Sequence, residues 1–356
     1  MNNIAKIGQK LIEKNLDAVI ITDEKNQRYA TGFAFTDGTV VVGREKAWLI
    51  TDSRYIEAAE KTAGGCCEVQ MFDREHSQLS LIRAALAECG AQRIGAEEMK
   101  LSHRQYLDLE SRIEHELLPA QDIFYELRAS KNEEEIAFMR RAQEISEAAL
   151  EETVHIIKPG MTEREVAAEL VYRMLRHGSE GNSFDPIVVT GAKTSMPHGV
   201  PGDVVIKEGD FITMDFGSLS GGYCSDMTRT VAVGYATDEM KNIYDIVLRA
   251  QLAGIAAAKA GIPGCEIDAA ARKVIDDAGY GRYFGHSFGH SLGLDIHEAP
   301  NAAPSGKTPM PVGAVVSAEP GIYLPGKFGV RIEDVMIMRE GGCEVITKAP
   351  KQLIIL

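Results

Sequence analysis

The sequence predicts an α/β (α+β) protein in which a small N-terminal domain precedes a larger C-terminal domain made of two similar halves. Three observations lead to this fold class. The chain has 356 residues, which is more than one domain usually holds. Short apolar runs alternate with helical stretches in its first third, and a helix–turn–helix pattern near residue 160 recurs about a hundred residues later. We place the domain boundary between residues 125 and 126.

The N-terminal domain, residues 1–125, contains three short apolar runs that predict buried strands, at 17–22, 38–42 and 47–51. Residues 76–90 predict a helix that ends at Gly90. The domain contains no group of residues that suggests a catalytic site to us. We therefore expect the chemistry of the chain to lie in the C-terminal domain.

The C-terminal domain, residues 126–356, opens on two predicted helices. The first runs from Asn132 to about Ile157. The second begins at Thr162, because Thr162 and Glu165 have the spacing of a capping box, and it ends near Gly178. A second pair of helices follows, the first at 238–259 and the next starting near Cys265.

These two helix pairs align at an offset of 101 residues. Around the first turn, Lys158, Gly160 and Glu165 align with Lys259, Gly261 and Glu266. Chance agreement between two ordinary helical hairpins is the alternative explanation. Because the agreement extends through the turn, we interpret the domain as two similar helix–helix–strand halves that face each other, with a site in the cleft between them.

Two hairpins are predicted after these helices. Residues 210–217 and 221–234 alternate apolar and polar side chains around a Gly-Gly turn. Residues 314–324 and 329–338 form the second candidate hairpin. We expect each of these four segments to be one continuous strand.

The charge balance argues against two classes of partner. The chain carries 38 Lys and Arg against 52 Asp and Glu, a net charge of −14, which disfavours nucleic acid and an anionic membrane surface. Its six cysteines form no C-x-x-C pair, so we expect a reducing compartment. The first residues contain no apolar run of the kind found in signal peptides, and we expect a cytoplasmic protein.

Four acidic residues interrupt the apolar segments of the predicted hairpins: Asp215, Asp226, Glu319 and Glu333. A single such acid would most simply be an edge-strand residue that faces water. Four of them, together with a histidine-rich segment, favour shared neutralisation by metal ions, because isolated buried carboxylates are costly. Four carboxylates and one imidazole can hold two divalent ions, and their oxygen-rich ligation favours Mn²⁺, Co²⁺ or Zn²⁺. Such ions lower the pKa of bound water toward neutrality.

The segment 285–298, GHSFGHSLGLDIHE, matches the serine-hydrolase pattern G-x-S-x-G twice. No apolar strand precedes Ser287 or Ser291 and glycines prevent a helix after them, so we disfavour either serine as a nucleophile. The same glycines favour an extended segment. On a strand, His286 and His290 would lie about 13 Å apart, too far to share one ion. One of them is then a metal ligand and the other a supporting residue.

Several of these segments together resemble one family. FITMDFG, GGYCSDMTRT, GHSFGHSLGLDIHEAP, SAEPGIY and VRIED occur in the order found in the dinuclear M24 metallopeptidases that include aminopeptidase P and prolidase. TDSRYIEAAEK, residues 51–61, is similar to their creatinase-like N-terminal domain. The resemblance covers most of the chain. It implies a pita-bread catalytic domain, in agreement with the two similar halves.

The resemblance also implies roles for individual residues. Asp215 matches the ligand of one metal, Asp226 and Glu333 match the bridging carboxylates, and His290 and Glu319 match the ligands of the other metal. His198 matches a histidine that approaches the substrate and shuttles protons, and His297 matches one that stabilises the tetrahedral intermediate. His286 and Arg331 match residues that support the substrate and the metals. Glu319 is also expected to act as general base.

The implied activity is hydrolysis of Xaa-Pro bonds at peptide N-termini by a hydroxide that bridges two metal ions, with Mn²⁺ expected and Co²⁺ or Zn²⁺ as alternatives. The substrate is then a proline-containing peptide or dipeptide, and a homodimer is expected. Two other functions stay open: a pita-bread aminopeptidase without proline preference, and a non-catalytic homologue that binds a peptide or protein. The sequence does not distinguish a dipeptidase from an aminopeptidase.

Overall fold

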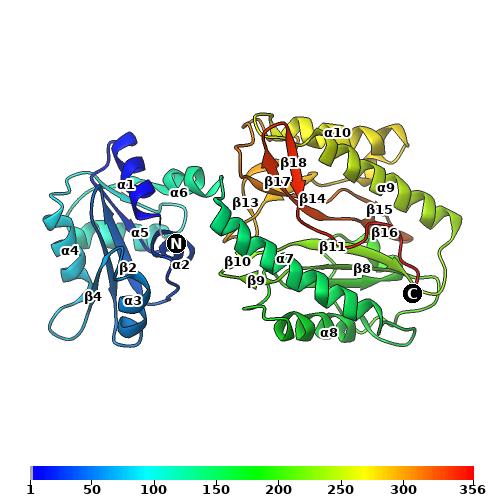
Figure 1. The fold of residues 1–356 in the computed structure, drawn as a ribbon, viewed down its shortest axis with the longest axis horizontal. Coiled ribbons are helices and arrows are strands. Elements are labelled where there is room, and N and C mark those ends of the chain that lie inside the picture. The colour runs from blue at the N-terminus through cyan, green and yellow to red at the C-terminus, as the bar shows by residue number, and fades with distance from the viewer. Residues whose placement is uncertain (1–2) are drawn as a thin grey trace. The chain divides into compact units, whose positions relative to one another are not determined.

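The computed structural model describes residues 3–356, and the chain divides after Arg128 into two compact units (Figure 1). Each unit has its own sheets and its own buried core. Within the described residues, no helix is long and apolar enough to cross a membrane. All six cysteines lie in the described part and carry free thiols.

The N-terminal unit is built on one six-stranded sheet in the order β4-β3-β2-β1-β5-β6. Strands β1, β2 and β3 pair antiparallel and the other neighbours pair parallel. The three strands expected from apolar runs are confirmed as β1, β2 and β3. Every residue of β1 and β3 is buried, as their apolar sequences predict. The strands are β1 (Ala18–Ile21), β2 (Gly38–Gly43), β3 (Ala47–Thr51), β4 (Glu68–Met71), β5 (Ile94–Ala96) and β6 (Leu117–Pro119).

Six helices accompany this sheet. The predicted helix that ends near Gly90 is α4, and Gly90 has a positive φ of 62° that suits glycine. Side chains of α4 pack with Trp48 and Ile94 of the sheet in one core. The helices are α1 (Ile4–Glu13), α2 (Glu24–Thr31), α3 (Ile56–Ala63), α4 (Gln78–Glu88), α5 (His103–Ile113) and α6 (Gln121–Arg128).

The C-terminal unit contains the four predicted helices, α7 (Glu133–Val154), α8 (Glu163–Arg176), α9 (Asp238–Ala257) and α10 (Gly264–Asp277). The capping box at Thr162 is present, and an offset of 101 residues places both ends of α8 on those of α10. The turns before them match as well, since Gly160 and Gly261 both have positive φ, at 97° and 87°. The repeated halves predicted from the sequence are therefore visible in the helices.

Each helix pair covers its own set of strands. Figure 1 shows α7 and α8 on one side of the strands and α9 and α10 on the other. The first pair packs on the sheet β11-β8-β7, formed by β7 (Ile187–Thr190), β8 (Phe211–Phe216) and β11 (Met227–Ala232). The second pair packs on the sheet β13-β12-β14-β17-β18 and on the hairpin β15-β16.

The strands of this second half are short. They are β12 (Gly289–Ser291), β13 (Glu298–Ala302), β14 (Val315–Ala318), β15 (Gly321–Leu324), β16 (Phe328–Arg331), β17 (Asp334–Arg339) and β18 (Gly342–Val345). The first half adds a small pair, β9 (Leu219–Ser220) and β10 (Tyr223–Cys224), and two 3-10 turns complete the unit, η1 (Gly191–Ser195) and η2 (Gly281–Tyr283).

The expectation of four continuous strands is correct for one segment, β8, and wrong for the other three. Segment 221–234 is broken between β10 and β11, at Ser225 and Asp226. Segments 314–324 and 329–338 are broken at Glu319 and Glu333, so that β14 pairs with β17 while β15 pairs with β16 in another sheet. The backbone N–H groups at these breaks bond elsewhere; for example, Glu333 N donates to Thr228 O. Three of the four expected acids therefore lie where strands end.

Candidate metal centre and active site

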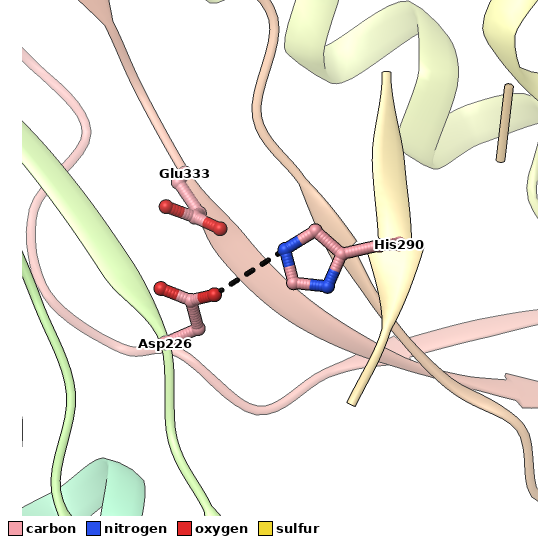
Figure 2. A group of neighbouring side chains, drawn as sticks. All are labelled: Asp226, His290 and Glu333. Carbon is pink, nitrogen blue, oxygen red and sulfur yellow. Dashed lines mark ion pairs between the residues drawn. The ribbon is translucent and has the colours of Figure 1, made fainter. Parts of the chain in front are cut away.

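Asp226, His290 and Glu333 bring their side chains to one point inside the C-terminal unit. One ligand atom from each lies within 4.8 Å of the others. Figure 2 shows the three side chains directed toward one another from three different chain segments. Asp226 is 4% and Glu333 1% exposed, so water does not solvate this pair of carboxylates. Three potential ligands at this spacing fit a single divalent ion.

The hydrogen bonds of this cluster leave ligand atoms without partners. Asp226 Oδ1, Glu333 Oε1 and Asp215 Oδ1 are buried and have no hydrogen-bond partner among residues 3–356. The other oxygen of Glu333 accepts a 2.7 Å bond from Thr228 Oγ1. Buried carboxylate oxygens are rarely left unpaired, because that costs the full free energy of desolvation. The residues present therefore fit divalent metal ions.

The electrostatics of the cluster support the same conclusion. Burial raises the pKa of the Asp226 carboxyl well above its usual range, and the charges of Asp215 and Glu319 raise it further. Burial also raises the pKa of Glu333, and the charge of Asp226 adds to that effect. Without a cation the site favours protonated carboxyls, whereas bound divalent ions would stabilise the ionised forms.

Glu319 extends the cluster through its contact with His290. His290 Nε2 lies 3.3 Å from Glu319 Oε1 and 3.5 Å from Asp226 Oδ2. His290 Nδ1 faces the backbone carbonyl of Ser291 at 3.2 Å, which leaves Nε2 as the nitrogen directed at the carboxylates. Desolvation by burial lowers the pKa of His290, so the neutral imidazole, the form that binds metals, is favoured.

Asp215 is held beside the cluster by an arginine. Arg331 Nη2 donates a 2.5 Å bond to Asp215 Oδ2, and both residues are buried. The Nε of Arg331 donates to Thr228 Oγ1 at 3.0 Å, and its Nη1 donates to the hydroxyl of Tyr323 at 3.0 Å. Arg331 thus fixes one oxygen of Asp215 and leaves the other free for a cation.

The three predicted active-site histidines have different surroundings. His297 directly precedes β13, and its ring lies 4.3 Å from that of His290, centroid to centroid. His286 and His198 both line a cavity of about 390 Å³. His286 Nε2 is hydrogen-bonded to Tyr323 OH at 2.9 Å, whereas His198 is exposed on the loop after η1. The expected extended segment is confirmed only for Gly289–Ser291, because His286 lies before β12.

The model of metallopeptidase family M24 matches residues 137–340, which is more than half of the chain. The chain belongs to metallopeptidase family M24. Residues 3–130 match the creatinase/prolidase N-terminal domain, so the order of the two domains is also that expected from the sequence.

Individual relatives of this M24 peptidase cover its whole length. The uncharacterised peptidase YqhT of Bacillus subtilis is 40% identical over 99% of both chains. Among solved structures, the Xaa-Pro dipeptidase from Bacillus anthracis has a TM-score of 0.95 at 42% identity and covers 99% of both chains. The X-Pro aminopeptidase from Thermotoga maritima has a TM-score of 0.93 at 36% identity and covers 98% of this chain and 99% of its own. The pita-bread fold expected for the catalytic domain is thereby confirmed.

The sequence did not single out two residues that organise the M24 site. Thr228 contacts both Glu333 and Arg331, and Tyr323 joins Arg331 to His286. Both stand in motifs that carry the family resemblance, GGYCSDMTRT and SAEPGIY. The pairing of the predicted hairpin could have indicated Thr228, because Thr228 lies opposite Asp215 where β11 pairs with β8. The register itself depends on where β10 ends, and the apolar pattern does not show that break.

Ser291, the serine of the second G-x-S-x-G match, is not activated. Ser291 is fully buried and its Oγ donates a 2.5 Å bond to the backbone carbonyl of Pro300. A serine nucleophile needs its hydroxyl hydrogen-bonded to a base. The hydroxyl of Ser291 instead donates to a backbone carbonyl, which is not a general base, so the serine-hydrolase interpretation is wrong for Ser291.

Proposed function

We propose that this M24 peptidase hydrolyses the Xaa-Pro bond at the N-terminus of peptides or dipeptides. The observation that carries this proposal is the buried cluster of Asp226, His290 and Glu333, whose carboxylates keep unpaired oxygens. The relatives named as Xaa-Pro dipeptidase and X-Pro aminopeptidase supply the substrate class. They share both domains and almost the whole length of the chain.

The proposed centre holds two divalent ions, with Mn²⁺ preferred and Co²⁺ or Zn²⁺ as alternatives. Asp215 would bind one ion, His290 and Glu319 the other, and Asp226 and Glu333 would be shared. When bound, the ions supply Lewis-acid polarisation of the scissile carbonyl and lower the pKa of water to near neutrality. Arg331 holds Asp215 in the orientation that this assignment requires.

The protein side chains around the centre are proposed to move protons and to bind the substrate oxygen. Burial raises the pKa of Glu319, which suits a general base that returns its proton to the proline nitrogen, alone or with His198. Desolvation, and then the neighbouring His290, lower the pKa of His297, so its neutral ring can donate one hydrogen bond to the developing oxyanion. His286 supports the site through its bond to Tyr323.

A tertiary amide explains why such a centre is useful. The Xaa-Pro bond has no N–H, and the proline ring fixes φ, so peptidases that grip that N–H cannot bind it in the usual way. We propose that the chain acts in the cytoplasm, in line with its six free thiols, and as a homodimer. The proposed domain assignment stays at 1–125 and 126–356.

The substrate class is tested with three peptides. The Mn²⁺-loaded protein is given Ala-Pro, Ala-Pro-Ala and Ala-Ala, and the released amino acids are quantified. The proposal predicts turnover of one or both proline peptides and little turnover of Ala-Ala. Equal rates on Ala-Ala would contradict it and favour an aminopeptidase without proline preference. Binding of the peptides without turnover would favour a non-catalytic homologue. The ratio of the two proline rates separates a dipeptidase from an aminopeptidase.

A further inference from the structure

A buried carboxylate on α8 lies outside the metal cluster and has no role in the proposed reaction. Glu163, the first residue of α8, is fully buried. Within the described part of the chain, the hydrogen bonds that its side-chain oxygens accept all come from the segment 190–202, which carries His198. A buried carboxylate is tolerated only when strong hydrogen-bond donors surround it. Because one loop supplies these donors, we infer that Glu163 stabilises the conformation of that loop.

The bonds of Glu163 join the two ends of this loop. Its Oε1 accepts from Thr190 N at 2.9 Å, where β7 ends. Its Oε2 accepts from Gly202 N at 2.9 Å and from Lys193 Nζ at 2.6 Å. The Lys193 ammonium also donates to Val200 O at 2.7 Å, two residues after His198. Glu163 and Lys193 together therefore bind both ends of the loop, Thr190 at its start and Val200 and Gly202 at its end.

The far side of the loop is fixed to the proposed site. The hydroxyl of Thr194 accepts from Gly329 N in β16 at 2.8 Å, and Arg331 Nη1 approaches Pro197 O at 3.4 Å. A Cβ at Gly199 would come within 2.7 Å of a Val189 methyl, so the backbone after His198 lies against β7. The side chain of His198 is itself exposed. Its position depends on the loop.

We propose that Glu163 and Lys193 are positioning residues that set the place of the His198 imidazole in the active site. This inference rests on the proposed function, in which His198 takes part in proton transfer to the proline nitrogen. Proton transfer requires the donor within about 3 Å of the acceptor. A loop that samples other conformations therefore lowers the rate of proton transfer without changing the metal site.

Glu163→Gln is the informative substitution. Both oxygens of Glu163 accept from N–H donors, so an amide NH₂ in either orientation meets a donor. The change therefore releases one end of the loop and removes the charge that pairs with Lys193. Glu165→Gln is the matched control, because Glu165 lies on the same helical turn, is exposed and accepts only from Thr162. Glutamine serves that capping box equally well.

A double-mutant cycle distinguishes positioning from general damage. We expect Glu163→Gln to lower kcat/KM on Ala-Pro roughly ten- to a hundred-fold, mostly in kcat, with unchanged metal content. In a His198→Ala background the same change should have almost no further effect, because its target is gone. Fully additive losses, an unaltered rate in Glu163→Gln, or full activity of His198→Ala would each overturn the proposal. Lys193→Met, which removes one partner from a half-exposed position, replaces Glu163→Gln if that variant does not fold.

A second measurement does not depend on activity. Hydrogen exchange followed by mass spectrometry should show faster exchange of the 196–202 amides in Glu163→Gln and in Lys193→Met, and not in Glu165→Gln. Unchanged protection of that segment contradicts the proposal. If the wild-type protein cleaves no Xaa-Pro peptide, the proposed function fails, and the exchange result still decides whether the pair orders the loop.

Discussion

Thr228 shows how one hydroxyl can serve two functional side chains. It donates to Glu333 Oε2 and accepts from Arg331 Nε, which in turn holds Asp215. Polar contacts behind metal ligands fix ligand orientation, and their removal commonly costs ten- to a hundred-fold in affinity, roughly. Thr228 therefore supports carboxylates that we assign to both ions.

Thr228→Val is expected to weaken Mn²⁺ binding by roughly ten- to a hundred-fold, because valine keeps the volume and loses the hydroxyl. Calorimetric titration of metal-free protein measures this. Thr213→Val is the control, since the hydroxyl of Thr213 contacts that of Thr230 in the same sheet and no carboxylate. Equal affinities for the Thr228 variant and the wild type would contradict the assigned role.

Ser291→Ala is expected to keep its activity. The buried hydroxyl only bonds Pro300 O, so its loss should lower the free energy of unfolding by about 1 kcal/mol. Urea unfolding and Ala-Pro turnover measure the two effects. Labelling of Ser291 by a fluorophosphonate probe, or loss of turnover in a folded Ser291→Ala variant, would restore the serine-hydrolase interpretation.

At the residue scale, the sequence predicts best those residues that are costly in their surroundings. Asp226 and Glu333 stand out because a charge interrupts an apolar run. Thr228, Tyr323 and Glu163 do not stand out, because such residues are ordinary in a strand or a first helical turn. Their importance lies in contacts with residues far along the chain, and no local pattern reports those contacts.

At the scale of elements, the site depends on how closely β12 approaches β14. An ideal Cβ at Gly289 would lie 2.0 Å from the backbone oxygen of Ser317, a distance that real Cβ atoms do not adopt. Gly289 is the residue before His290. The backbone N–H of His290 donates to Ser317 Oγ at 3.0 Å, and this bond holds the backbone of His290 against β14. The glycine allows the strand to bring the histidine to the carboxylates.

Gly289→Ala should therefore displace β12, lower the free energy of unfolding by roughly 1–3 kcal/mol and weaken metal binding. Thermal unfolding and metal analysis of the purified variant check both effects. Gly285→Ala is the matched control, because a Cβ there meets nothing within 4 Å. Similar behaviour of the two variants would show that the close approach of the strands does not matter.

The five helices predicted from the sequence, α4 and α7 to α10, lie within about three residues of their expected bounds, whereas the strand breaks could not be predicted. Capping boxes and glycines mark helix ends directly, as at Thr162 and Gly90. The breaks at Asp226, Glu319 and Glu333 fall inside continuous apolar patterns, because the flanking strands are buried in different sheets. Tertiary packing decides where those strands end.

At the scale of the whole molecule, the acidic cluster links stability to pH. In the metal-free protein, burial and then neighbouring charges raise the pKa of Asp226 and Glu333. The folded chain then binds more protons than the unfolded chain between the raised pKa values and the unfolded values of about 4. Within that window the free energy of unfolding rises as the pH falls.

We expect the metal-free protein to melt at a higher temperature at about pH 6 than at about pH 8, and the stabilisation by added Mn²⁺ to be larger at the higher pH, where fewer protons compete. Calorimetric scans at both pH values measure this. The net charge of −14 also raises the melting temperature as the pH falls. The control is therefore the double variant Asp226→Asn/Glu333→Gln, in which the rise in melting temperature from about pH 8 to about pH 6 should be smaller. An undiminished gain in that double variant would assign the effect to net charge instead.

The central claim is that this M24 peptidase needs divalent ions held by the Asp226, His290 and Glu333 cluster to cleave an Xaa-Pro bond. The most direct measurement follows Ala-Pro turnover and bound metal in parallel, for the wild type, for Asp226→Asn, and for Asp245→Asn as an exposed control. We predict that chelation abolishes turnover, that Mn²⁺ or Co²⁺ restores it in the wild type and the control, and that Asp226→Asn loses metal and about a thousand-fold in kcat/KM. Turnover that survives chelation, or a fully active Asp226→Asn, would contradict the account.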